Sequence, residues 1–296
     1  MFRFLQDIPD NPFLLTGLAA GLLASVTCGV IGPYVVTRRI VFLAGAIAHT
    51  AVGGVGAALF VKTTLGVPQD QYTWLPLAGA TVVAVGSAVL LGILHERVKE
   101  RMDTLIGAVW AVGMAGGLLL VQLTPGYQGD LMRYLFGAIS LVSVQQLVML
   151  AAIAAVTLTV TLICHKRFMS ICLDRQQSEL QGVNVLAMDI LLLCLVALTV
   201  ITLVSVVGLI LVIALLCLPA AAVSRQASRM SGVMLGCVLL CAALTTLPRM
   251  AVYDLTIGGR GVPPEPAIVI AAGLVYLAAV VVGKIKTTSG PATTAE

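Results

Sequence analysis

The sequence predicts an all-α membrane protein, a polytopic bundle of about nine helices that each cross the bilayer. Hydrophobic residues make up 59% of the 296 residues and charged residues only 10%, whereas soluble domains have roughly 45–50% and 25%. The mean hydropathy is +1.07. This excess of apolar side chains excludes an ordinary cytosolic enzyme, a disordered chain and a disulfide-rich secreted domain.

The individual spans follow from apolar runs of about 20 residues, the length that a helix needs to cross roughly 30 Å of hydrocarbon. Nine runs fit best, within a range of eight to ten. They are residues 13–31, 42–61, 73–94, 104–121, 141–163, 186–203, 206–222, 232–247 and 267–283. The stretch 186–222 is too long for one helix, so a break is predicted near Ser205. The short apolar segment 131–140 is a candidate re-entrant or interfacial piece.

The two ends of the chain are expected to differ. The first run is predicted to be a retained span rather than a signal peptide, because Arg3 precedes it together with Asp7 and Asp10 and no A-x-A site follows it. Residues 1–286 are expected to form a single transmembrane domain. Residues 287–296, rich in Thr, Ser and Pro, are expected to form a disordered cytoplasmic tail.

The basic residues indicate the orientation, because Lys and Arg collect on the cytoplasmic side of a membrane protein. Of the 17 Lys and Arg residues, all but five follow the first, third, fifth, seventh and ninth runs. The five are Arg3, Lys62, Arg133, Arg249 and Arg260. The N-terminus is therefore expected outside and the C-terminus inside the cell (inner) membrane. The basic residues do not cluster into a patch, so no nucleic-acid partner is expected.

Three pairs of glycines stand one helical turn apart: Gly17/Gly21, Gly113/Gly117 and Gly232/Gly236. Such pairs let helix backbones approach closely in lipid. They favour dense packing inside the bundle, with a specific dimer contact as the alternative. The polar residues 248–266, which contain four prolines, are expected to form an outer loop.

His49 is the candidate functional residue inside the membrane, because ionisable groups in hydrocarbon are costly. It lies about eight residues into the second run, roughly 12 Å deep. Gly45, Gly53 and Gly56 share its helical face and leave space beside the imidazole. Two interpretations stay open: a neutral histidine bonded across a helix interface, or a ligand or gate for a borderline-soft metal ion such as zinc or iron.

Two other candidates inside the spans are weaker. Asp189 lies about 5 Å into the sixth run and can reach the cytoplasmic interface, where it would be solvated. Cys237 and Cys241 are spaced to touch one metal ion, but buried packing is the preferred interpretation. No P-loop sequence is present, so this chain does not bind ATP by that motif.

Six blocks of sequence stand in a fixed order along the chain: GPYVVTRRIVFLAGAIAHTAVGGVG (32–56), DTLIGAVWAVGMAGGLLL (103–120), YLFGAISLVS (134–143), DRQQSELQG (174–182), VGLILVIALLCLPAAA (207–222) and PPEPAIVIAA (263–272). In this order they resemble the permease subunit of the ATP-binding-cassette (ABC) importers for zinc, manganese and iron. The resemblance implies a transport subunit rather than an enzyme. It implies no cofactor in this chain, and a divalent metal ion as cargo.

The same resemblance implies the partners. A second permease copy would complete a central path, cytoplasmic ATP-binding subunits would hydrolyse ATP, and an extracytoplasmic metal-binding protein would deliver the cargo. Segment 168–184 would be the coupling helix that meets the ATPase. Its site residues would be Asp174, Arg175, Glu179 and Gly182, although a solvated loop is the simpler alternative.

The chain departs from the family at the His49 helix. An Asp four residues before the histidine is replaced by Gly45, and a Pro four residues after it by Gly53. Losing the carboxylate removes a hard oxygen ligand, so imidazole alone favours zinc over manganese. A stand-alone secondary carrier and a membrane-embedded lipid enzyme remain as alternative functions.

Overall fold

The computed structural model describes residues 7, 11–66, 74–98, 100–124, 142–227, 229–253, 255–257 and 260–288. The predicted all-α class is confirmed. The helices are α2 (Pro12–Thr37), α3 (Val41–Thr64), α4 (Leu75–Val98), α5 (Met102–Gln122), α7 (Val144–Leu173), α8 (Arg175–Leu180), α9 (Val185–Val207), α10 (Leu209–Val223), α11 (Met230–Val252) and α12 (Pro264–Thr288). A two-stranded antiparallel pair, β1 (Thr256–Ile257) and β2 (Arg260–Gly261), joins α11 to α12.

Eight helices of the described residues are long and apolar enough to cross a membrane, and α10 is a shorter apolar helix. This number agrees with the predicted eight to ten. α7 has 30 residues, which is about 45 Å of helix, so its C-terminal end extends beyond a hydrocarbon layer of roughly 30 Å. The predicted re-entrant segment 131–140 lies outside the described residues.

Several boundaries differ from the expected ones. The break between α9 and α10 falls at Gly208 rather than near Ser205, because Gly208 has φ +90°, a conformation that other residues rarely adopt. α11 continues through Pro248 and Arg249 to Val252, so the expected outer loop from 248 begins too early. α12 extends to Thr288, and residues 289–296 lie outside the described part.

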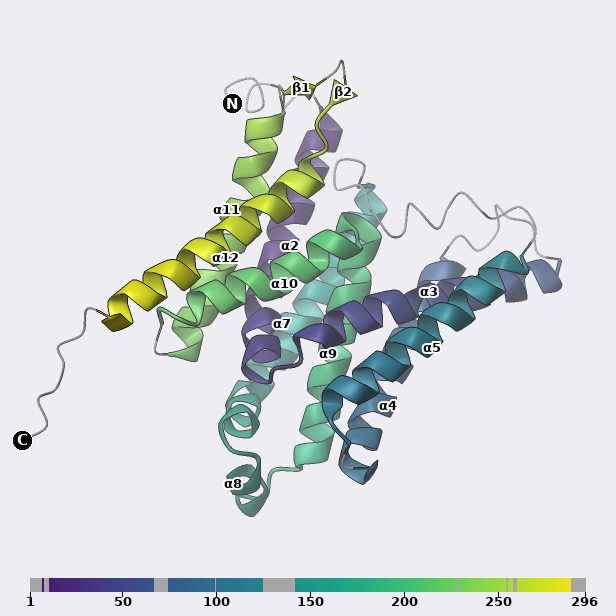
Figure 1. The fold of residues 1–296 in the computed structure, drawn as a ribbon. Helices are drawn as coiled ribbons and strands as arrows, with labels where there is room; N and C mark the ends of the chain where they lie inside the picture. Colours follow the sequence, from purple (N-terminus) through teal and green to yellow (C-terminus); the bar gives the residue numbers. More distant parts are fainter. Residues whose placement is uncertain are drawn as a thin grey trace, which may run out of the picture.

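α9 lies at the centre of the bundle (Figure 1) and most of its side chains are buried. α3, α4 and α5 pack together on one side of it. α2, α10, α11 and α12 form a second group, and α7 packs on α2 and α9. α5 and α12 are mostly exposed, which is expected of helices that face lipid or another protein.

The Gly113/Gly117 pair packs α5 closely against α3. A Cβ on Gly53 would lie 2.8 Å from the carbonyl oxygen of Gly113, and a Cβ on Gly117 would lie 2.5 Å from the Gly53 nitrogen. Backbones that approach this closely exclude any side chain between them. The expected dense packing is therefore present at this pair, and it fixes α5 beside the His49 helix.

Candidate functional site

His49 and Trp110 form an aromatic pair where α3 meets α5. Their ring centroids are 4.9 Å apart and the ring planes differ by 14°, so the rings are stacked. His49 is half-buried, whereas Trp110 is 37% exposed on the outer face of α5. The close glycine contacts between α3 and α5 place the two rings together. The sequence analysis did not identify Trp110, and nothing in its local sequence points to this pairing.

The Nδ1 atom of His49 is buried and has no hydrogen-bond partner among the described residues. A buried polar atom without a partner costs free energy, so such an atom in a membrane protein is a candidate ligand. The described residues contain no group of three or more His, Cys, Asp and Glu side chains that could hold a metal ion. His49 thus stays a candidate ligand that belongs to no such group in the described part of the chain.

Gly45 and Gly53 lie one turn on either side of His49, but their surroundings differ. A Cβ on Gly45 would meet only the Ile213 Cδ1 atom, at an ordinary 3.5 Å. A Cβ on Gly53 would press on the Gly113 backbone at 2.8 Å. The packing of α5 thus explains why position 53 is glycine, and nothing in the structure requires glycine at position 45.

This difference gives a testable expectation. Gly53→Ala should lower the thermal stability and the purified yield of the protein, because α3 and α5 must separate to admit the methyl group. Gly45→Ala, on the same helix, should leave both unchanged. Thermal unfolding of the two variants in detergent measures the effect. Equal melting temperatures for both variants would contradict it.

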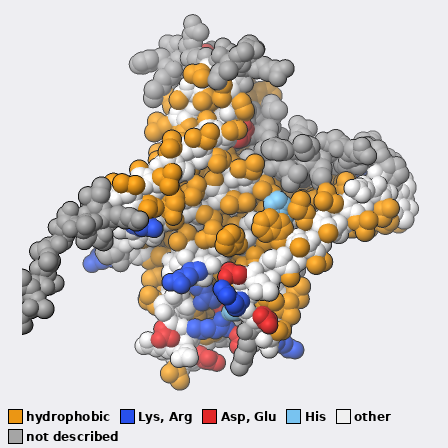
Figure 2. Space-filling model, viewed as in Figure 1, with side chains coloured by type: hydrophobic (Ala, Val, Ile, Leu, Met, Phe, Trp, Pro, Cys, Tyr) orange, Lys and Arg blue, Asp and Glu red, His pale blue; other side chains and the backbone are white. Residues whose placement is uncertain are grey.

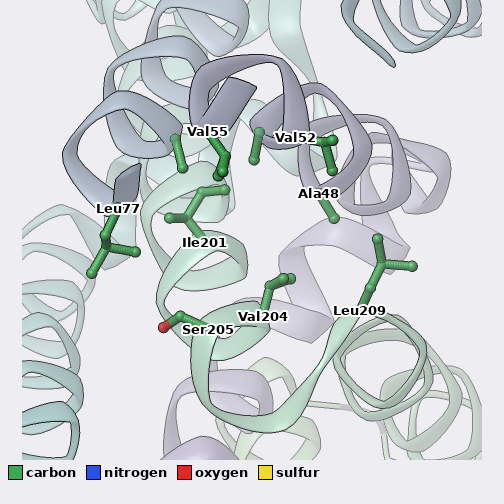
Figure 3. Close-up of a pocket in the computed structure, with 10 residues that line it drawn as sticks. Ala48, Val52, Val55, Leu77, Ile201, Val204, Ser205 and Leu209 are labelled. Carbon is green, nitrogen blue, oxygen red and sulfur yellow. The ribbon is translucent and has the colours of Figure 1, made fainter. Parts of the chain in front are cut away.

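A small cavity lies beside the His49 helix (Figure 3), with a volume of about 20 Å³. Its walls are Ala48, Ala51, Val52 and Val55 of α3, Leu77 and Ala80 of α4, Ile201, Val204 and Ser205 of α9, and Leu209 of α10. The Ser205 hydroxyl already donates to the Thr202 carbonyl at 2.8 Å. The cavity has room for about one water, and its walls are apolar apart from the Ser205 hydroxyl, so they offer no charged ligand for a cation.

The predicted coupling segment forms the short helix α8 at the end of the molecule where charged side chains gather (Figure 2). Asp174 caps the helix, since its Oδ1 accepts from the Gln177 N–H at 3.1 Å. Gly182 ends it with φ +78°. Ser178 is fully buried, with its Oγ 2.6 Å from the Ser170 Oγ of α7. The segment is thus a fixed helix rather than an irregular loop.

The residues predicted to couple to an ATPase divide into two groups. Asp174, Glu179 and Gly182 are exposed, as a surface that meets another protein requires. The Arg175 guanidinium instead pairs within the chain, with Glu96 of α4 and Asp189 of α9. Leu180 at the end of α8 is 89% exposed. Leu180 was not among the residues predicted from the sequence, although an apolar residue inside a polar segment is a signal for such a position.

A groove of about 430 Å³ runs between the last turns of α7 and α8. Its walls are His165, Lys166, Met169, Ser170, Leu173, Asp174, Gln177 and Gln181. His165, a groove residue of α7, has its Nδ1 atom 2.6 Å from the Tyr34 hydroxyl of α2.

Three other expectations are now decided. Asp189 is not simply solvated, because it is buried and ion-paired with Arg38 and Arg175.

Lys62 and Arg249, expected in outer loops, lie in the last turns of α3 and α11 and are buried. Cys237 and Cys241 are fully buried free thiols, and Cys241 Sγ lies 3.5 Å from the Leu215 carbonyl, which agrees with packing.

Comparison with known proteins agrees with this architecture. A probable metal transport system membrane protein of Chlamydia muridarum is 32% identical over 282 residues, which cover 95% of this chain and 92% of the relative. A chelated iron transport system membrane protein of Yersinia pestis is 29% identical, covering 97% and 91%. A high-affinity zinc uptake system membrane protein of Haemophilus influenzae is 23% identical, covering 90% and 94%.

The fold also matches a solved structure. PsaBC from Streptococcus pneumoniae in complex with Fab superposes with a TM-score of 0.77 at 22% identity, covering 94% of each chain. The ABC 3 transport family matches residues 10–283. This multi-pass membrane chain therefore belongs to the ABC 3 transport family, as its resemblance to metal-ion importer permeases indicates.

Proposed function

We propose that this chain is the permease subunit of an ABC importer that moves a divalent transition-metal ion into the cytoplasm. The observation that carries the proposal is the His49 imidazole, whose buried Nδ1 has no partner in the described part of the chain. Zinc is favoured, with manganese or iron next, because Gly45 supplies no carboxylate and imidazole alone suits zinc. The names of the relatives support a metal cargo but include both zinc and chelated iron.

A second copy of the chain completes the path. The outer face of α5 is exposed and carries small residues such as Gly107 and Gly116, which have open space where a Cβ would stand. Small residues at helix faces favour helix association in lipid. Two copies that met along α5 would bring both His49–Trp110 pairs toward one shared path.

The energy comes from separate ATP-binding subunits on the cytoplasmic side. α8 offers them an exposed surface of Asp174, Glu179, Leu180 and Gly182. An extracytoplasmic metal-binding protein delivers the ion to the opposite end. ATP binding and the loaded binding protein then both bias a two-state equilibrium between outward-open and inward-open permease.

The elemental content of cells lacking the gene tests the proposal. Cells are grown at limiting metal, with and without a plasmid copy, and their zinc, manganese and iron are measured by mass spectrometry. We expect a selective loss of one metal, zinc first, that the plasmid restores. The uptake should fall when ATP is depleted. An unchanged content of all three metals, in a strain without a redundant importer, would refute the proposed cargo.

A further inference from the structure

A cluster of four charged side chains joins the coupling helix to three other helices. Asp189 stands in the second turn of α9 and is 9% exposed at its side chain. Its Oδ1 accepts from Arg38 Nη2 at 2.6 Å, and its Oδ2 is ion-paired with Arg175 Nη1 at 2.9 Å. Arg175 also pairs with Glu96 through its Nη2. We call these four residues the Asp189 cluster.

Each member comes from a different element. Arg38 is the C-cap of α2, and Glu96 lies in the last turn of α4. Arg175 is the first residue of α8. Arg38 Nη1 also donates to the Ile171 carbonyl of α7 at 3.0 Å. Asp189 thus ties α8 to α2 through Arg175 and Arg38, and Arg175 ties α8 to α4 through Glu96.

The charges in the Asp189 cluster balance, since two guanidinium groups face two carboxylates. Both carboxylate oxygens of Asp189 are engaged, so no lone charge is left in the buried centre. Removing one member of a buried pair leaves the other charge uncompensated, which is strongly unfavourable. Breaking these ion pairs is therefore costly, so the Asp189 cluster holds α8 against α2, α4 and α9.

We propose that Asp189 is a positioning residue for transport, one that makes α8, α2 and α4 move as one body. The inference rests on the proposed role of α8 as the surface that an ATPase moves. α4 packs against the His49 helix α3, and α2 packs against α9. A displacement of α8 is thereby passed to the helices around the path instead of being absorbed in the short turns beside α8. The salt bridges are the rigid link.

The test separates coupling from assembly. Asp189→Asn, Asp189→Glu and wild type are each purified with their ATPase partner and reconstituted in liposomes with the loaded binding protein. ATP hydrolysis and zinc uptake are both measured. Asp189→Asn loses the charge but keeps an oxygen that accepts from Arg38, so we expect it to be less stable yet still to assemble and hydrolyse ATP. Zinc moved per ATP should fall about tenfold, a typical size for coupling between sites. Asp189→Glu should recover most of that ratio.

Two further variants keep the test decisive. Arg175→Gln removes the link to α8 but leaves Asp189 paired with Arg38, so it should fold and show the same fall in zinc per ATP. Asp103→Asn removes an exposed ion pair, Arg101–Asp103 at 3.8 Å, from the start of α5; it should match wild type.

A normal ratio in both Asp189→Asn and Arg175→Gln, or a parallel loss of hydrolysis and uptake in both, would overturn the proposal. Absence of ATP-dependent uptake in wild type would instead refute the proposed function itself.

Discussion

His49→Ala should abolish metal uptake and leave the assembled permease intact. Among the side chains on its face of α3, the imidazole is the one that can bind a borderline-soft cation. Its Nδ1 atom has no hydrogen-bond partner among the described residues that would compete with a cation. Losing a group that merely supports a metal ligand costs about 10–100-fold in affinity, so loss of the ligand itself should lower uptake by at least that much. Uptake of radioactive zinc by cells that express each variant measures the effect.

The packing around His49 predicts that the variant still folds. Alanine fits a face where α3 meets α5, and the glycine contacts that join these helices do not involve the imidazole. Size-exclusion chromatography and ATPase co-purification verify this. His95→Ala, in the last turn of α4, is the matched control and should transport normally. Normal uptake by His49→Ala would remove His49 from the path.

Leu180→Ala should release the ATPase from the permease. Leu180 is 89% exposed at the end of α8, in a polar segment outside the long apolar helices. A leucine that becomes buried at an interface contributes about 1.5–3 kcal/mol, which corresponds to roughly 10–100-fold in affinity. We therefore expect the amount of ATPase that co-purifies to drop by about tenfold or more, and uptake to fall with it.

Leu162→Ala provides the control for this variant. Leu162 is 75% exposed as well, but it lies inside the long apolar helix α7, so its truncation should change neither co-purification nor uptake. Retention of the ATPase by Leu180→Ala would mean that α8 docks through its polar residues alone. Loss of the ATPase in both variants would point to a general effect of leucine removal.

Prediction from the sequence was most reliable where the property is local. The spans and their approximate number follow from the composition of about 20 consecutive residues, because each helix satisfies its own backbone in lipid. The glycine pair at 113 and 117 correctly indicated a close helix contact. The break at Gly208 was placed about one turn too early, because a single residue with positive φ decides it.

The sequence by itself thus determined the membrane class, the family resemblance and His49 as the candidate ligand. Tertiary structure alone decided that His49 stacks on Trp110. It alone decided that position 53 has no room for a side chain, because the backbone of α5 lies against it. It also decided that Asp189 is buried between Arg38 and Arg175 rather than solvated. These contacts join residues from different helices. Their geometry is set by how apolar helices pack, which the periodicity of one helix does not encode.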